Sequence, residues 1–451
     1  MSSTEQQSLT NKLYGYLAED EDARVCKDIP DAACNDQPQA FLAHLWALTL
    51  TKLGDSLVSA RLVLPWMLTA LGAPSFFISA LVPLRESLAL LPQLIIAQQL
   101  RQTPVRKWFW VAGSLGQAAA LVGMLVAVLT TRGELLGWII IVLLTLFSIA
   151  RGVCSVAIKD VQGKTISKTK RGRLTGLAAS IAGLLSLLTA LVIIGVPQVG
   201  SDNQASEWLF AALLGAAALL WLCAALIYAA VPEVPGATEG GGNALVEALK
   251  SLRLLWQDRQ FGQFVITRAL LVASAFAIPY LVVMIQVAGT DQTGDDLQLT
   301  SLGGLMLASG LAGLLAGRFW GRWSDRASHQ VMAVAALLAT AVMAIAVAVM
   351  ALAPAWLAQP WVGGGLIFAA AVAHHGARVG RKTYLVDMAT QGNRAQFTAV
   401  SNTVIGLVLL LGMLLGVVDS LLGIEAVMLT LIGLGLLAAV RAWRLPNVQQ
   451  D

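Results

Sequence analysis

Charged residues are scarce in this chain of 451 residues: Asp, Glu, Lys and Arg make up 12%, whereas hydrophobic residues make up 57%. Soluble globular domains carry about 25% charged residues. So little charge excludes a water-soluble domain of this length. The net charge of +4 does not indicate nucleic-acid binding, because the basic residues lie in short loops between apolar stretches.

Sequence patterns that carry chemistry are missing as well. No Gly-rich loop followed by Lys and Ser or Thr is present, which argues against direct coupling to ATP. No Ser/His/Asp arrangement, metal-ligand cluster or pair of catalytic carboxylates is recognisable. The sequence therefore predicts neither an enzyme nor a bound metal, cofactor or nucleic acid.

Cysteine is rare, with four in the chain. Cys154 and Cys223 lie in apolar stretches, where we expect them to pack as small apolar side chains. Cys26 and Cys34 lie in the polar stretch 1–38, which lacks the basic start and apolar run of a signal peptide. We expect this stretch to be a cytoplasmic tail with reduced thiols and a short helix over residues 9–17.

Apolar stretches of roughly 20 residues dominate the rest of the chain, and a helix of that length crosses a bilayer. They predict an all-α polytopic membrane protein with about twelve transmembrane helices. The expected spans start near Ala47, Pro74, Trp108, Leu135, Leu174, Trp208, Phe261, Thr300, Val331, Trp361, Phe397 and Ile424.

Turns rich in Lys and Arg alternate along the chain with turns that have almost none. An excess of Lys and Arg marks the cytoplasmic side, so we expect both termini to be cytoplasmic and the protein to cross a cytoplasmic (inner) membrane. The even-numbered turns hold Arg101, Arg106, Lys107, Lys159, Lys164, Lys168, Lys170, Arg171, Arg173, Lys250, Arg253, Arg259, Arg318, Arg322, Arg326, Arg378, Arg381, Lys382 and Arg394. The opposite turns hold Arg132 with Asp202, Glu207, Asp291, Asp295, Asp296, Asp419 and Glu425.

The pattern repeats at about half the chain length. A shift of 214 lays Leu57-Val58 and Pro65-Trp66 over Leu271-Val272 and Pro279-Tyr280. Shifts of 223 and 225 align further Trp, Lys, Arg and Thr residues. We therefore expect a tail (1–38), a six-helix bundle (39–231), a Gly- and Pro-rich cytoplasmic linker with an amphipathic segment (232–258) and a second six-helix bundle (259–445).

Two parallel six-span halves joined by such a linker resemble the major facilitator superfamily of secondary transporters. Gly321, Asp325 and Arg326, between the eighth and ninth spans, are similar to the family's cytoplasmic loop signature. The resemblance implies that this loop helps to hold one side of the transporter closed, that spans 1, 4, 7 and 10 line a central cavity, and that the protein is a monomer.

The resemblance is incomplete in three places. Ser328, His329 and Gln330 stand where the signature continues with Gly and two basic residues. The equivalent loop of the first half has Leu100 where the acid belongs. The fifth span lacks the adjacent Gly-Pro pair of the family's drug/proton antiporters, which argues against drug efflux.

Several ionisable residues fall inside the expected spans, where a charge is costly unless it faces a cavity or a partner. Lys52 and Asp55 lie three residues apart on one helix face, whereas the adjacent Arg85 and Glu86 point in different directions. The others are Arg61, Arg151, Arg268, His374, His375 and Arg378.

Several of these residues could instead have a structural role that involves neither substrate nor proton binding. Arg61, Arg268 and Arg378 could extend their side chains to the lipid headgroups. Lys52 and Asp55 could form a structural ion pair. His374 and His375 could be neutral packing residues, although their ordinary pKa also suits proton transfer.

We interpret the chain as a secondary active transporter, symporter or antiporter, that moves a small polar solute by alternating access. Proton coupling is the preferred hypothesis, with Asp55, Glu86, His374 and His375 as candidate proton sites. Basic groups outnumber acidic ones inside the spans, so the hypothesis extends to an organic anion. Its candidate ligands are Lys52, Arg85, Arg151, Arg268 and Arg378. The alternatives are export of amphipathic compounds or drugs, and a membrane receptor or assembly factor that does not transport.

Overall fold

The computed structural model describes residues 10, 12–15, 17, 31–91, 96, 99–100, 102–195, 203–235, 252–293, 299–390 and 394–449. All regular structure in these residues is helical. Seven stretches of them are long and apolar enough to cross a membrane. The predicted class, an all-α polytopic membrane protein, is confirmed.

Residues 31–235, here called the N-terminal part, form six helical segments that we call crossings, the first of them broken into two helices. Their helices are α2 (Asp31–Asn35), α3 (Gln37–Leu57), α4 (Val63–Ala70), the short 3-10 helix η1 (Ser75–Phe77), α5 (Ile78–Leu90), α7 (Lys107–Thr130), α8 (Gly133–Thr165), α9 (Lys168–Gly195) and α10 (Asn203–Ala229).

Residues 252–449, the C-terminal part, form six more crossings. Their helices are α12 (Leu254–Gln257), α13 (Arg259–Leu270), α14 (Ala273–Thr293), α15 (Leu299–Leu352), α16 (Pro354–Leu357), α17 (Pro360–Met388), α18 (Arg394–Leu411), η2 (Gly412–Leu414) and α19 (Leu415–Trp443). α15 holds two crossings that meet at the non-helical residue Ala327. In α19 the chain turns at Gly423, whose φ of +80° favours glycine because it has no Cβ.

The first crossing of each part is broken near its middle. α3 ends at Leu57 and α4 begins at Val63, two residues before Pro65. A proline lacks an N–H donor and its ring clashes with the carbonyl four residues earlier, here that of Arg61, which favours a break in this segment. Pro83 and Pro279 lie inside continuous helices, so proline alone does not determine where a break occurs. α13 and α14 are interrupted at 271–272, the position that a shift of 214 aligns with 57–58. The internal repeat is therefore visible in the backbone.

The two parts are packed together at one end of the molecule and separate at the other. At the first end, buried residues of α4, α5, α14 and α19 belong to one apolar core. There the side-chain amide of Gln286 donates to the carbonyl oxygen of Trp66 at 3.0 Å. A Cβ on Gly416 of α19 would meet the carbonyl oxygen of Phe76 at 2.9 Å, so only glycine permits this approach.

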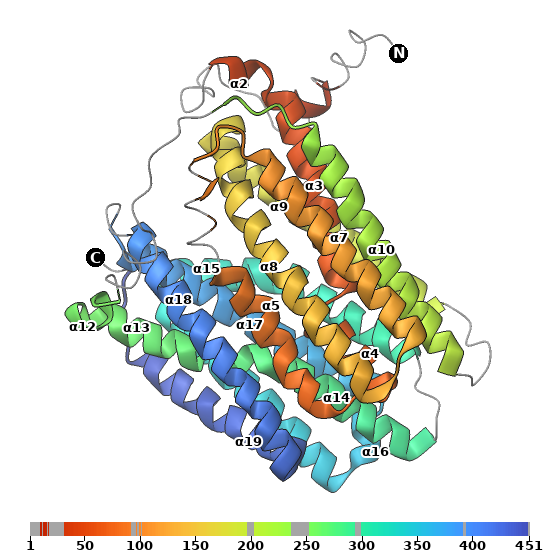
Figure 1. Ribbon diagram of the computed structural model, residues 1–451. Coiled ribbons are helices and arrows are strands. Elements are labelled where there is room, and N and C mark those ends of the chain that lie inside the picture. The colour runs from red at the N-terminus through yellow and green to blue at the C-terminus, as the bar shows by residue number, and fades with distance from the viewer. Residues whose placement is uncertain are drawn as a thin grey trace.

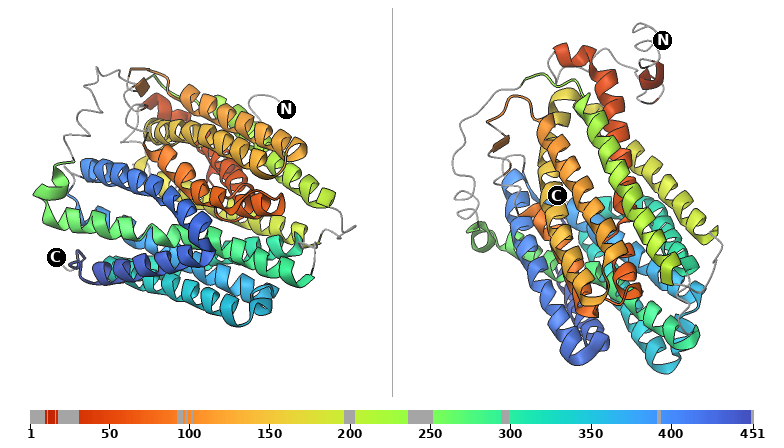
Figure 2. Two further views of the ribbon diagram at one scale, coloured as in Figure 1. Left: turned by 60° about the horizontal axis from the view of Figure 1, so that its bottom comes forward. Right: turned by 45° about the vertical axis from the view of Figure 1, so that its right-hand side comes forward.

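Toward the other end the apolar cores divide. One set of core residues includes Trp110 and Tyr228 and comes from the N-terminal part only. Another includes Phe261 and Phe397 and comes from the C-terminal part only. Figure 1 shows the same arrangement: the two groups of helices approach each other near α4, α14 and α16 and spread apart toward the end where the C-terminus lies. Figure 2 shows from two further directions that the helices of both groups run side by side.

Several sequence-based expectations need correction. Lys159 and Lys164 lie inside α8, and Arg378 to Lys382 lie inside α17, rather than in turns. Cys34 is disulfide-bonded, so the expectation of a reduced thiol is wrong for this residue. The described part of the tail does contain the expected helix, at residues 12–15. Predictions for Cys26, Arg101, Asp202, Asp295, Asp296 and residues 236–251 concern positions outside those described.

Candidate functional site

An ion-pair cluster inside the N-terminal part is built around Asp55 of α3. Arg85 of α5 donates from Nη2 to Asp55 Oδ1 at 2.5 Å. Arg151 of α8 reaches both carboxylate oxygens, at 2.7 and 2.5 Å. Two guanidinium groups thus share one carboxylate, and the cluster keeps a net charge of +1.

Aromatic side chains support both arginines. The Arg85 guanidinium lies 4.5 Å from the centre of the Phe147 ring, and that of Arg151 lies 5.7 Å from the Trp221 ring. Trp221 and Phe147 are buried and contact each other edge to face. Ring faces attract cations, and this attraction strengthens where water is excluded. The aromatic pair therefore fixes where the two positive charges lie.

A second ion pair joins the break of the first crossing to α5. Arg61 Nη2 donates to Glu86 Oε1 at 2.7 Å, with the two side chains 25% and 43% exposed. The expectation that Arg85 and Glu86 have different partners is confirmed. The alternative that Arg61 extends to the headgroups is wrong, because this side chain is held by Glu86.

A cavity of about 380 Å³, lined by both polar and apolar residues, lies between α3, α9, α15 and α17. Its ionisable lining residues are Lys52, His375 and Arg378, and no carboxylate lines it among the described residues. Lys52 lies one turn before Asp55 on α3, so the cavity lies beside the Asp55 cluster. The hydroxyl groups that line it belong to Ser56, Ser59, Ser186 and Ser309.

The two histidines have different surroundings. Arg378 Nη2 lies 3.3 Å from His375 Nδ1. A guanidinium can only donate, so Nδ1 accepts, and the neutral ring carries its proton on Nε2. His374 is 7% exposed, and neither of its ring nitrogens has a hydrogen-bond partner among the described residues.

Arg268 of α13 is held away from the cavity. It is 9% exposed and donates to Ser401 Oγ at 2.6 Å and to Asn402 Oδ1 at 2.8 Å, both on α18. The alternative that Arg268 extends to the headgroups is therefore wrong. Both of its partners are neutral, so its positive charge has no counterion within 4.0 Å in the described part of the chain.

The structure thus brings most of the candidate residues together in two adjacent groups. Asp55, Arg85 and Arg151 form one, and Lys52, His375 and Arg378 line the other. The alternative of a Lys52–Asp55 ion pair is wrong, because Asp55 is held by the two arginines instead.

The proposed gate motif lies elsewhere, at the end of the first half of α15. Gly321, Asp325 and Arg326 directly precede the break at Ala327. Asp325 and Arg326 are exposed, and the Arg326 carbonyl accepts a hydrogen bond from Asn447 Nδ2 at 3.4 Å. Nothing in this geometry tests a gating role, which stays a prediction.

Some residues of the site escaped the sequence analysis. Phe147 and Trp221 look like ordinary apolar residues of a span, and no local pattern shows that they lie over guanidinium groups. Ser186 and Ser309 have no distinguishing neighbours in the sequence either.

Comparisons with known proteins agree with this architecture. A family model described as Major Facilitator Superfamily matches residues 46–374. No curated protein matches the chain. The structure is similar to that of a variant of the nucleoside transporter NupG, with a TM-score of 0.67 and 13% identity, covering 90% of this chain and 99% of that one.

Two xylose transporters are also similar in structure. For the D-xylose-proton symporter, the TM-score is 0.67 at 14% identity, covering 92% of this chain and 99% of that one. For the inward open conformation of XylE from E. coli, the TM-score is 0.62 at 13% identity, covering 91% and 97%. At such low identity these likenesses show the fold alone.

Proposed function

The chain belongs to the Major Facilitator Superfamily, and from this premise we propose that it is a proton-coupled secondary transporter of a small organic anion. The family and fold are those of transporters rather than enzymes. We propose an anionic substrate because of the residues that line the cavity. Their ionisable groups are two cations and a histidine, without a carboxylate among the described residues. Such a cavity attracts negative charge.

Lys52 and Arg378 are the proposed direct ligands of the anion. They come from α3 and α17, one from each part of the molecule, so a bound anion would attract both parts toward each other. Of the four serine hydroxyl groups of the lining, those of Ser56 and Ser186 donate to backbone carbonyls, and those of Ser59 and Ser309 can donate to the oxygen atoms of the anion. Arg85 and Arg151 are further candidates, because they are released when Asp55 is neutralised. Arg268 is committed to Ser401 and Asn402, so we omit it from the binding site.

Asp55 is the proposed main proton site, and Glu86 the second. A proton that binds the Asp55 carboxylate removes the negative charge shared by Arg85 and Arg151. The two guanidinium groups can then turn to the substrate anion, so proton and anion enter together. Nδ1 of His375 accepts from Arg378, so this ring can take up a proton only when Arg378 turns away to the substrate anion. His374 is a further candidate; it is buried, and its ring nitrogens have no hydrogen-bond partner among the described residues.

Alternating access would follow from motion of the two parts. We propose that the bundles 39–231 and 259–445 rock about the end where they share one apolar core, joined by the linker 232–258. The separate cores at the other end support this view. In this structure the two parts are separate at the end where the C-terminus lies.

We propose that the end where the two parts are separate faces the cytoplasm and that the membrane is the inner one. The distribution of Lys and Arg over many turns supports it. The disulfide of Cys34 favours the opposite orientation, because such bonds are typical of oxidising compartments. The topology rests on more residues than the disulfide does, and labelling of single cysteines in whole cells at residues 12 and 449 tests it directly.

Transport by purified protein in liposomes tests the coupling. Asp55→Asn and Glu86→Gln should each reduce anion uptake driven by an acid outside pH to background, because the carboxylate can no longer bind a proton. Exchange of labelled for unlabelled substrate without a pH gradient should persist. Glu134→Gln, at an exposed carboxylate far from the cluster, is the matched control. Undiminished pH-driven uptake in both variants would reject the proton sites.

Thermal-shift screening of the purified protein against anions and cations, over a range of pH, identifies the substrate class. An anion that stabilises the wild type should bind about tenfold more weakly to Lys52→Gln or Arg378→Gln, the loss expected for one charge-assisted hydrogen bond. Stabilisation by cations only would reject the anion. The absence of any solute flux in liposomes would favour the receptor or assembly factor instead.

A further inference from the structure

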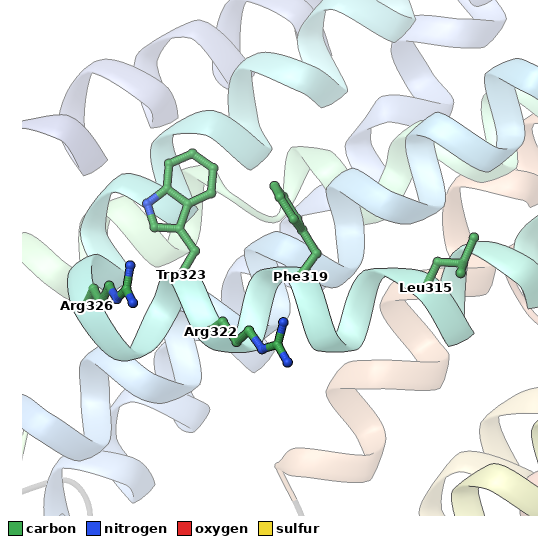
Figure 3. Close-up of a pocket in the computed structure, with 5 residues that line it drawn as sticks. All are labelled: Leu315, Phe319, Arg322, Trp323 and Arg326. Atoms are coloured by element: carbon green, nitrogen blue, oxygen red, sulfur yellow. The ribbon is translucent and has the colours of Figure 1, made fainter.

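One surface of α15 combines aromatic, apolar and cationic side chains in a way that the transport site does not use. Figure 3 shows Leu315, Phe319 and Trp323 along the helix, with the guanidinium groups of Arg322 and Arg326 beside them. These five residues line a shallow groove of about 730 Å³. Leu315 and Phe319 are 63% and 58% exposed. In a helix that crosses a membrane, such a surface meets lipid.

The aromatic side of the groove is rigid. Trp320 is 2% exposed and donates from Nε1 to the Val372 carbonyl at 2.9 Å. Trp323 stacks on Trp320 with ring centres 5.7 Å apart, and Phe319 meets both rings edge to face, at 4.9 and 5.9 Å. The exposed rings are therefore held by a buried one, and a ligand would not have to order them.

The two arginines have no counterion in the structure. No carboxylate lies within 4.0 Å of Arg322 or Arg326 among the described residues, although the exposed Asp325 lies in the same turn. The arginines are four residues apart, so they lie on neighbouring turns of one helix face. A guanidinium matches the oxygen atoms of a phosphate with two parallel hydrogen bonds.

The order of these groups along the helix matches an amphiphile. Arg326 directly precedes Ala327, where α15 breaks between two crossings, and Trp323 and Arg322 lie about one turn before it. Tryptophan is common at the membrane–water interface. Phe319 and Leu315 follow toward the middle of the crossing. Polar groups at the interface and apolar groups toward the membrane centre correspond to the headgroup and acyl chain of a lipid.

We propose that this groove binds an anionic phospholipid. The phosphate lies between Arg322 and Arg326, and an acyl chain lies along Trp323, Phe319 and Leu315. A free phosphate ion would use only the arginines, and a soluble protein could not reach the apolar end within the bilayer. Because the cytoplasmic leaflet is rich in anionic lipid, the site agrees with the proposed orientation.

Native mass spectrometry and thermal unfolding of the full chain in detergent test the proposal. The probes are phosphatidylglycerol, phosphatidylcholine with the same acyl chains, and inorganic phosphate. Wild type should retain phosphatidylglycerol and unfold at a higher temperature with it, whereas the other two probes should have little effect. Arg322→Gln with Arg326→Gln should weaken phosphatidylglycerol binding about tenfold or more, because two charge-assisted contacts are lost.

The matched control removes two arginines from the same end of the molecule. Arg441 and Arg444 are exposed on and just after α19, beside the exposed Trp443. Arg441→Gln with Arg444→Gln should leave phosphatidylglycerol binding unchanged. Equal losses in the two double variants, an equal response to phosphatidylcholine, or a full response to inorganic phosphate would each overturn the site. Unfolding temperatures without lipid show that the variants are folded.

Discussion

All seven ion pairs found among the described residues lie in the N-terminal part, between residues 55 and 233, whereas the described residues of the C-terminal part form none. Inside the membrane, Arg85 and Arg151 lie against the carboxylate of Asp55. In the C-terminal part, Arg268 lies against the neutral side chains of Ser401 and Asn402. The same kind of basic residue is thus neutralised in one part and left charged in the other.

The ends of the two parts show the same difference. Glu233, which follows the sixth crossing, accepts from the backbone N–H groups of Arg106 and Lys107 at the start of α7 and forms an ion pair with Lys164 at 3.0 Å. In this way it satisfies N–H groups that have no partner within the helix. Arg106 also forms an ion pair with Asp160 at 2.5 Å.

In the C-terminal part, the corresponding contact to the backbone comes from a neutral residue. Gln449, which follows the last crossing, accepts from the backbone N–H of Ser328 at 3.1 Å and donates to Asp387 at 2.8 Å. At the position that corresponds to Glu233, the backbone group is thus satisfied by an amide instead of a carboxylate. Cations without counterions therefore gather in the C-terminal part, and both proposed anionic ligands, substrate and lipid, contact it.

The largest expected effect on stability is at the centre of the charged cluster. Asp55→Asn leaves Arg85 and Arg151 facing each other and should lower the free energy of unfolding by about 2–4 kcal/mol, somewhat less than for a fully buried pair because Asp55 is 21% exposed. Adding Arg151→Gln should recover part of the loss. Arg268→Gln, whose partners are neutral, should cost only about 1–2 kcal/mol. Denaturant unfolding in detergent measures the free energy of unfolding of these variants. Equal losses for Asp55→Asn and Arg268→Gln would contradict the proposed difference between the two parts.

Glu233 and Gln449 sharpen the comparison at the ends of the two parts. Glu233→Gln should cost about 1–3 kcal/mol, because its side chain is fully buried and loses the ion pair with Lys164. Gln449→Ala should cost about 1 kcal/mol or less, since it removes hydrogen bonds at a partly exposed position and breaks no ion pair. Thermal unfolding of the two variants in the same detergent checks the order, and a larger cost at Gln449 would contradict it.

The smallest effect is expected at the ion pair between Arg132 and Glu207, whose side chains are 44% and 16% exposed. Arg132→Gln should change the free energy of unfolding by at most about 0.5 kcal/mol, because water screens the pair and both side chains lose freedom in forming it. The same unfolding assay applies. A change above 1 kcal/mol would mean that ion pairs stabilise the N-terminal part even at its surface.

The sequence was a good guide to the helices and a partial guide to the site. The expected starts near Trp108, Leu135 and Trp361 lie within two residues of where α7, α8 and α17 begin. The adjacent Arg85 and Glu86 were correctly expected to have separate partners. The partners themselves were not predictable, since 96 residues separate Asp55 from Arg151 and 25 separate Arg61 from Glu86.

By itself, the sequence determined that the chain crosses a membrane many times, where most helices begin, and which ionisable residues lie within the bilayer. Hydrophobic length depends on neighbouring residues, so it can be read locally. Only the tertiary structure decided that Asp55 is shared by two arginines while Lys52 and Arg378 line a cavity without a carboxylate among the described residues. Helix packing determines which side chains meet, and the packed surfaces come from segments far apart in the chain.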